Sequence, residues 1–217
     1  MRNIAIVARK GGSGKTTVAV NLAIAAFRRG YEVRIADTDP QGSATEVLKV
    51  RQAEGPSVFR LSDQDLFERE RSAPTSGVDT TILDTPAASI DVIGHAIALA
   101  QLSLLVVRPT YLDIAAALQT AQILRSLRKP GLIVLNQAPV LRGGVEPPAV
   151  KRAQNALRMM QLPVVPVVLR SRAVYQTSLA TGRSVEEVEA GNPAADEIAG
   201  LWAYIERFAF GQASAVA

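Results

Sequence analysis

The chain of 217 residues contains no cysteine and only one histidine, His95. The absence of cysteine excludes disulfides, thiolate zinc sites, iron–sulfur clusters held by cysteine and cysteine nucleophiles. A metal site needs several convergent ligands, and His95 stands alone in the apolar run 93–102, so we interpret it as structural. Any catalysis must therefore depend on other groups.

Long apolar runs are also missing. No stretch reaches the roughly 18 apolar residues of a membrane helix, and the first residues do not have the pattern of a signal peptide. Hydrophobic residues make up 48% of the chain and charged residues 20%, which is typical of a folded globular protein. We therefore expect a cytoplasmic protein with no membrane partner, folded as a single domain over 1–217.

Short apolar runs alternate with longer segments of helical periodicity. This alternation predicts an α/β fold, with a mostly parallel central sheet covered by helices on both faces. The expected strands are 3–8, 32–37, 80–84, 103–107, 132–136 and 164–169. The expected helices are 15–29, 90–100, 114–127, 148–160 and 193–210. The polar stretch 49–77 is interpreted as an insertion between strands.

The segment 10–17, KGGSGKTT, directly follows an expected strand and leads into an expected helix. Its glycines allow the backbone to curl so that N–H groups approach phosphate oxygens, and the helix N-terminus attracts the same anion. A lysine at position 15 suits the β- and γ-phosphates, and the Thr16 hydroxyl suits Mg²⁺. We therefore predict a nucleotide-binding loop with these residues: Gly11, Gly12, Ser13, Gly14, Lys15, Thr16 and Thr17.

The loop departs from the generic pattern G-x-x-x-x-G-K-[ST], because Arg9 occupies its first position. With Lys10, however, it resembles the deviant Walker A loop of the ParA/MinD superfamily of ATPases. In that superfamily the additional lysine reaches the nucleotide of the partner subunit in a sandwich dimer. The resemblance implies that ATP and Mg²⁺ are the cofactors, that the ATP state is a homodimer, and that Lys10 and Lys15 serve catalysis.

Three aspartates follow expected strands, at the edge where open α/β sheets bind ligands. Asp84 ends 80–84 and precedes Thr85-Pro86, and Asp37 and Asp39 lie in DTDPQG. By resemblance, Asp84 is the Walker B magnesium ligand, Asp37 belongs to the magnesium shell, and Asp39 positions the attacking water. Turn or helix-capping roles are the alternative, above all for Asp37.

Later residues carry weaker signals. Asn136 ends an expected strand where relatives contact adenine, and an amide can both donate to and accept from the base. Pro166 and Val168 lie where relatives close over the base. Arg170 and Arg172 are the candidates for non-specific contact with DNA phosphates. The basic residues Lys151, Arg152 and Arg158 also qualify, although a solvated helix face explains them equally well.

The resemblance favours the small single-domain ParA type, similar to ParF proteins of plasmid partition, because we expect no N-terminal DNA-reading domain and no amphipathic membrane tail. It implies an ATPase of weak intrinsic activity that binds nucleoid DNA non-specifically and segregates plasmid or chromosomal DNA, stimulated by a ParB-type centromere-binding partner. The alternative is a ParA-like ATPase that positions a protein cargo, such as a chemoreceptor array or polyhedral body, through an adaptor. A ligase resembling dethiobiotin synthetase is disfavoured by Lys10 and DTDPQG.

Overall fold

The computed structural model describes residues 2–62, 77–87, 90–188 and 191–210. Within them one six-stranded sheet has the order β3-β2-β4-β1-β5-β6, and all neighbouring strands are parallel. Its strands are β1 (Arg2–Val7), β2 (Val33–Asp37), β3 (Ser57–Arg60), β4 (Thr80–Asp84), β5 (Leu102–Val107) and β6 (Gly131–Leu135). The predicted α/β fold is therefore confirmed.

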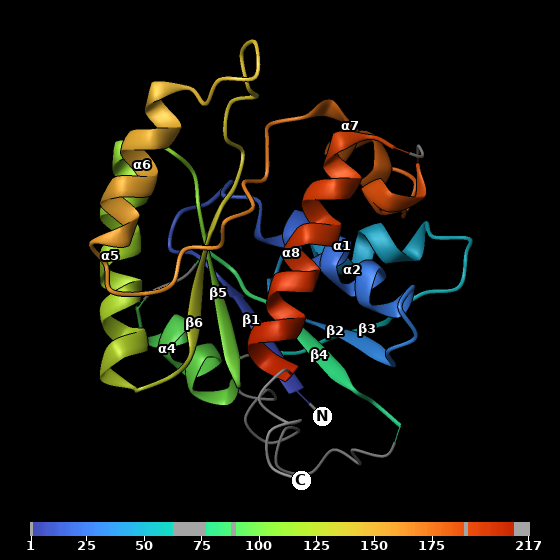
Figure 1. Ribbon diagram of the computed structural model, residues 1–217. Helices are drawn as coiled ribbons and strands as arrows, with labels where there is room; N and C mark the ends of the chain where they lie inside the picture. Colours follow the sequence, from blue (N-terminus) through green and yellow to red (C-terminus); the bar gives the residue numbers. More distant parts are fainter. Residues whose placement is uncertain (1, 63–76, 88–89, 189–190, 211–217) are drawn as a thin grey trace, which may run out of the picture.

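Helices cover both faces of the sheet (Figure 1). They are α1 (Lys15–Phe27), α2 (Ser43–Lys49), α4 (Ile90–Leu99), α5 (Tyr111–Ser126), α6 (Pro148–Arg158), α7 (Ala173–Leu179) and α8 (Pro193–Phe210), with a 3-10 turn η1 (Val185–Glu187). No described helix is long and apolar enough to cross a bilayer.

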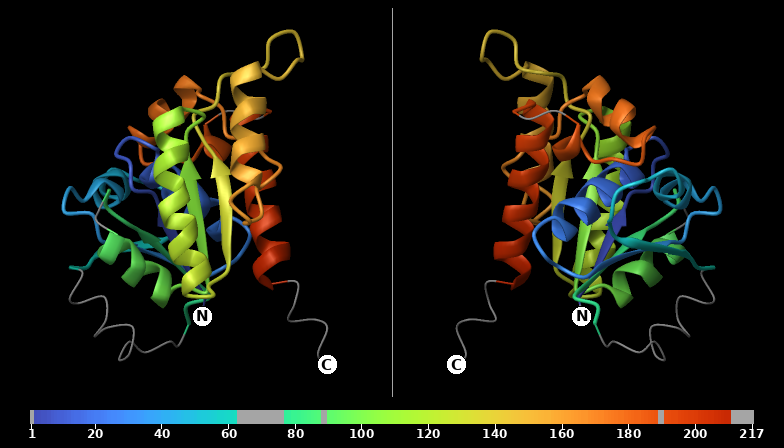
Figure 2. Two further views of the ribbon diagram at one scale, coloured as in Figure 1. Left: turned by 90° about the vertical axis from the view of Figure 1, so that its left-hand side faces the viewer. Right: turned by 90° about the vertical axis from the view of Figure 1, so that its right-hand side faces the viewer.

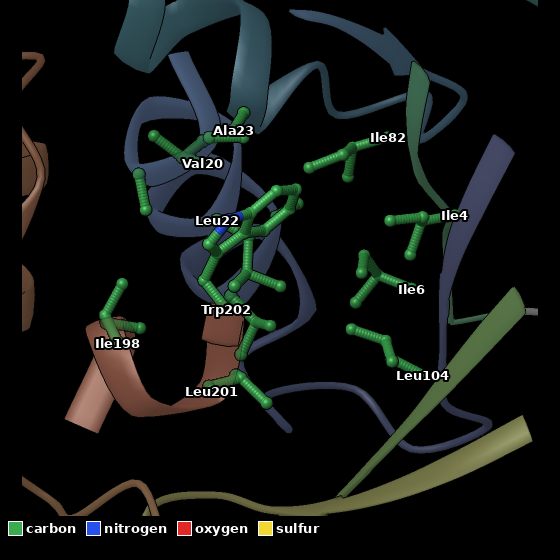
Figure 3. Close-up of a cluster of buried hydrophobic side chains, with 14 of the residues drawn as sticks. Ile4, Ile6, Val20, Leu22, Ala23, Ile82, Leu104, Ile198, Leu201 and Trp202 are labelled. Carbon is green, nitrogen blue, oxygen red and sulfur yellow. The ribbon is translucent and has the colours of Figure 1, made fainter. Parts of the chain in front are cut away.

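The central strand β1 feeds two hydrophobic cores, because successive side chains of a strand point to opposite faces. Ile4 and Ile6 belong to the core that packs α1 and α8 against the sheet. In that core the Trp202 side chain of α8 is fully buried among side chains of α1 and the strands (Figure 3). Ala5 and Val7 belong to the second core, under α4, α5 and α6.

The strand register brings the acidic strand ends together. Asp84 of β4 lies opposite Ile6 of β1 and opposite Asp37 of β2. Because the strands are parallel and share this edge, the loop after β1 lies next to both aspartates. The sheet thus gathers the predicted phosphate loop and two of the predicted acidic residues at one end.

Two sequence expectations were wrong. The stretch 49–77 is not only an insertion, because β3 forms within it and pairs with β2 at the sheet edge. The segment 164–169 does not form the predicted strand, although it runs beside β6 through a bridge from Ile133 to Val164. Pro163 and Pro166 have no N–H to donate, which prevents a continuous ladder.

Candidate nucleotide-binding site

The loop between β1 and α1 combines tight turns with the start of a long buried helix. Gly12 and Gly14 have positive φ angles of 70° and 88°, and Gly14 occupies the N-cap position of α1. A Cβ on Gly14 would collide with the amide of Asn136. Glycine is therefore required at position 14 by both backbone conformation and space.

Three side chains from the ends of β5 and β6 hold the carbonyl groups of this loop. Asn136 Nδ2 donates to the Ser13 carbonyl at 2.7 Å, and Gln137 Nε2 donates to the Gly12 carbonyl at 2.9 Å. Arg108 Nη2 makes a longer contact of 3.5 Å with the Gly11 carbonyl. In a trans peptide the next N–H points the opposite way. The amides of residues 12–14 therefore face away from these three side chains, which leaves them available to an anion.

Arg108 and Gln137 were missed from the sequence. Arg108 is itself fixed by Asp113, whose carboxylate lies 2.9 Å from Arg108 Nε. Asp113 in turn bonds to Thr110, the N-cap of α5. The sequence signal available was a threonine followed three residues later by an acidic residue at a helix start, next to an arginine at a strand end.

Lys15 is the first residue of α1 and is 7% exposed. Burial lowers the pKa of its ammonium group, while the negative charges of Asp84 and Asp39 oppose that shift. The side chain therefore lies within electrostatic range of both aspartates. A buried cation at a helix N-terminus suits a polyphosphate.

Asp84 is fully buried at the end of β4. Its carboxylate oxygens make no hydrogen bond of normal geometry among the described residues, although the Thr16 hydroxyl and the Lys15 ammonium group lie close to them. Burial raises its pKa to about 7. The Thr16 hydroxyl and Lys15 lower that pKa, whereas the charges of Asp37 and Asp39 raise it further. A buried carboxylate without a partner is costly unless a cation or hydrogen bond neutralises it.

Asp37 and Asp39 are held by their own loop. One Asp37 oxygen accepts bonds from the Thr45 amide and hydroxyl at 2.9 and 2.8 Å, so it caps the start of α2. Asp39 accepts a bond from the Gln41 amide at 2.9 Å and stays half-buried. Asp39 also borders a cavity of about 380 Å³ that reaches Arg60. Asp37 thus makes the capping contact that the sequence left open, and its place in the magnesium shell stays a prediction. Asp39, in contrast, faces open space.

The residues at this edge fit a magnesium nucleotide. Oxygen ligands suit Mg²⁺, and the buried carboxylate of Asp84 lies beside the Thr16 hydroxyl. Among the described residues, no three His, Asp or Glu side chains come together as a complete metal site. An ion here would thus draw on Thr16, Asp84 and phosphate oxygens, as P-loop proteins use Mg²⁺.

The late candidate residues are placed less favourably. Asn136 is buried beside the loop, with its amide nitrogen on Ser13, and Pro166 is exposed. Val168 packs into the core under α4, α5 and α6, so its side chain is not available to a base. Their contact with adenine stays a prediction, which for Val168 can involve only the backbone.

The two predicted DNA-binding arginines are engaged in ion pairs. Arg170 is 8% exposed, and its guanidinium bonds to both Glu146 oxygens at 2.7 Å and to the Pro139 carbonyl. Arg172 pairs with Glu197 at 2.8 Å. In this conformation Arg170 has a structural role that explains its burial. DNA contact by these residues therefore stays a prediction, and for Arg170 it requires Glu146 to be displaced.

Comparison with known proteins agrees with this geometry. Residues 4–200 match the family model of the CobQ/CobB/MinD/ParA nucleotide binding domain. The chain is 31% identical over 208 residues to the maintenance of carboxysome distribution protein A of Halothiobacillus neapolitanus, covering 90% of this chain and 92% of that protein. It is also 46% identical to the chromosome-partitioning ATPase Soj of Thermus thermophilus, but over only 68 residues, 31% of this chain and 26% of that protein.

Solved structures show the same fold. The MinD cell division ATPase of Pyrococcus furiosus has a TM-score of 0.78 at 22% identity, covering 95% of this chain and 99% of that one. The ATP complex of a Cyanothece McdA variant has a TM-score of 0.77 at 18% identity, covering 97% of this chain and 96% of that one. The match to the Halothiobacillus neapolitanus protein thus spans nearly the whole chain and is to a protein of carboxysome distribution, whereas the sequence motifs favoured the plasmid-partition type.

Proposed function

Because the chain belongs to the CobQ/CobB/MinD/ParA family of nucleotide-binding proteins, we propose that it is a ParA-type ATPase that positions a large protein cargo. The observation that carries this proposal is the match, over nine-tenths of both chains, to a protein of carboxysome distribution. The cargo class is a polyhedral protein body or a comparable protein assembly, bound through an adaptor. The ATP form dimerises and binds DNA non-specifically.

The nucleotide site supports the ATP part of this proposal. Lys15 contacts the β- and γ-phosphates, Thr16 and Asp84 hold Mg²⁺, and Asp39 orients the attacking water from its half-buried position. Bound Mg²⁺ neutralises charge that develops on the transferred phosphoryl group. Asp37 keeps the Asp39 segment in place through Thr45.

Lys10 supports the proposal that the ATP form is a dimer. Within the described residues the Lys10 ammonium group makes no ion pair. Lys15, at the other end of the same loop, differs from it because the carboxylates of Asp39 and Asp84 lie nearby. A cation left free beside a phosphate site suits an anion from outside the chain. We assign that anion to the nucleotide of a second copy, as the resemblance to deviant Walker loops implies.

DNA partition is the second candidate function, favoured by the matches to partition proteins. Caulobacter vibrioides ParA is 35% identical over 103 residues, which is 46% of this chain and 37% of that protein. This likeness covers less than half of the chain, whereas the carboxysome match covers nearly all of it. We therefore place cargo positioning first.

A deletion in the organism that encodes the chain separates the two functions. We expect fluorescently labelled protein bodies to cluster in the deletion strain while plasmid and chromosome inheritance stays unchanged. A complementing wild-type copy restores spacing, and a Lys15→Ala copy does not. Loss of plasmids with normally spaced protein bodies would support partition and contradict cargo positioning.

A further inference from the structure

Residues of α5 and α6 line an apolar groove. These two helices lie on the face of the sheet opposite α8 (Figure 1). The two helices lie side by side in the turned view as well (Figure 2). The groove has a volume of about 620 Å³, within the range of pockets that bind small ligands or side chains. Ile114 and Leu118 line it from α5, and Ala153 and Met160 line it from the α6 side.

Large apolar side chains at the rim of the groove are exposed to solvent. Tyr111 is 84% exposed, Met159 is 81% exposed and Leu118 is 44% exposed. Contiguous exposed apolar surface rimmed by polar groups marks interaction sites in soluble proteins. Methionine adapts its shape to a partner, which suits a binding surface. The groove therefore has the composition of a protein-docking site.

The charges around the groove have one sign. Among the lining residues in the described part of the chain, Arg152 is the single charged one, and the α6 sequence contains three basic residues and no acidic one. The only acidic residue of α5, Asp113, is 5% exposed and paired with Arg108. A segment that fills the groove therefore meets cations and no free carboxylate on these helices. An apolar segment with acidic residues is the complementary partner.

We propose that the groove docks an amphipathic helix of the cargo adaptor, with apolar residues at helical spacing and an aspartate or glutamate facing Arg152. Two helices that flank an apolar trough accept a third helix through residues at positions i, i+3, i+4 and i+7. This inference rests on the proposed positioning function, because it names the adaptor contact that such a function requires.

The groove also lies next to the phosphate loop. Pro109 and Tyr111 line it, and Thr110 between them caps α5 and bonds to Asp113. Asp113 holds Arg108, which contacts the Gly11 carbonyl of the loop. A helix bound against Pro109 and Tyr111 therefore contacts the residues on either side of Thr110, which is linked through Asp113 and Arg108 to the phosphate loop. Docking in the groove thereby changes the rate of ATP turnover as well as binding the cargo.

The test uses a displayed library of helical peptides, about 15 residues long so that they form helices. The library is selected against the full chain with Mg-ATP and counter-selected against the Ala115→Arg variant. Ala115 is exposed and lines the groove, so arginine there fills it and adds positive charge. We expect enriched peptides with apolar residues at helical spacing and acidic flanks. Their affinity falls at least about tenfold in Ala115→Arg and severalfold in Arg152→Glu, and they alter ATP turnover of the wild type.

The matched control is Gln119→Arg, which places the same charge at an exposed position of α5 outside the groove lining. This variant keeps wild-type peptide affinity. Thermal unfolding, ATP affinity and ATP-dependent DNA retention of Ala115→Arg stay at wild-type values, which separates failure of the groove from failure of the proposed ATP cycle. The proposal is overturned if no peptide is enriched, if the peptides bind Ala115→Arg equally, or if that variant loses dimerisation without peptide, which would make the groove a contact between copies.

Discussion

Asp84 and Arg170 are both buried charged residues, but their surroundings differ. Asp84 ends β4 beside the phosphate loop, and its two oxygens make no hydrogen bond of normal geometry in the described part of the chain, although the Thr16 hydroxyl and the Lys15 ammonium group lie near them. Arg170 lies in the segment that leads into α7, with Glu146 on both guanidinium nitrogens and the Pro139 carbonyl on one of them. Arg51 resembles Arg170, because it forms an ion pair with Glu187 at 2.8 Å and donates a hydrogen bond to the Gly182 carbonyl at 2.9 Å.

The difference distinguishes a ligand site from a structural contact. Leaving a buried charge without a partner costs several kcal/mol unless something neutralises it. Arg170 and Arg51 have that partner within the chain, so their burial needs no ligand. Asp84 has no such ion pair in the described part of the chain, and we propose that a magnesium ion brought in with the nucleotide completes its site.

The largest expected effect is at the nucleotide end. Lys15→Ala removes the buried cation of the loop, and we expect ATP affinity to fall by at least about 100-fold, since losing one partner of a buried charge contact costs about 2–5 kcal/mol. Titration calorimetry with Mg-ATP measures the change. Lys10→Ala is the matched control, and its monomer keeps ATP affinity within about threefold. Undiminished ATP binding by Lys15→Ala would refute the site.

The second prediction concerns Asp84→Asn in the absence of nucleotide. The folded protein raises the pKa of Asp84 from 3.8 to about 7, so protonation favours the folded state. The free energy of unfolding therefore falls as the pH rises from about 4 to about 7. Above about pH 7 this decrease is complete, because Asp84 is then ionised in both the folded and the unfolded state. We expect Asp84→Asn to be more stable than wild type by about 1–4 kcal/mol at pH 8.

Urea unfolding at pH 5 and pH 8 measures this difference, which should be larger at pH 8. Mg-ATP should stabilise the wild type and not the variant. A variant that is less stable than the wild type at pH 8 would show that Asp84 has a structural partner and would remove the contrast with Arg170.

The third prediction concerns the paired region. Arg170→Ala and Glu146→Ala each leave one partner of the pair alone, and we expect both to lower the free energy of unfolding by about 1–3 kcal/mol. The double variant should lower the free energy of unfolding by less than the sum of the two single variants. DNA affinity of the folded ATP form tests the predicted DNA contact of Arg170, because it stays unchanged in both variants if Arg170 is only structural. If Glu146→Ala strengthened DNA binding while Arg170→Ala weakened it, Arg170 would be a DNA contact.

The smallest effect is expected at Gln137. Its side chain supplies one hydrogen bond to the Gly12 carbonyl, worth about 0.5–1.5 kcal/mol. Gln137→Ala should raise the KM for ATP by about two- to tenfold and leave kcat nearly unchanged. Steady-state hydrolysis measures both. A large loss of kcat with constant KM would assign Gln137 to the chemical step rather than to the loop.

The sequence predicted the central strands and the placement of Asp37 and Asp84 because buried parallel strands are continuous apolar runs that end at one edge. It did not predict β3, which is polar and lies at the sheet edge, or the break at Pro163 and Pro166. Among the site residues, Lys15 and Asp84 follow from local motifs. Local motifs do not predict the roles of Arg108 and Gln137 or the pairing of Arg170 with Glu146. These contacts join segments that only the fold brings together.

One experiment tests most directly the proposal that ATP creates a DNA-binding dimer through the phosphate loop. Retention on DNA and molecular mass in solution should be measured together for wild type and Lys10→Ala, with ATP, ADP and no nucleotide. We expect the wild type to form a dimer that is retained on DNA only with ATP and that added salt releases steeply, because phosphate contacts dominate. The Lys10→Ala variant should stay monomeric and unbound. Equal DNA retention with ATP and ADP, or an ATP-dependent dimer of Lys10→Ala, would contradict this proposal.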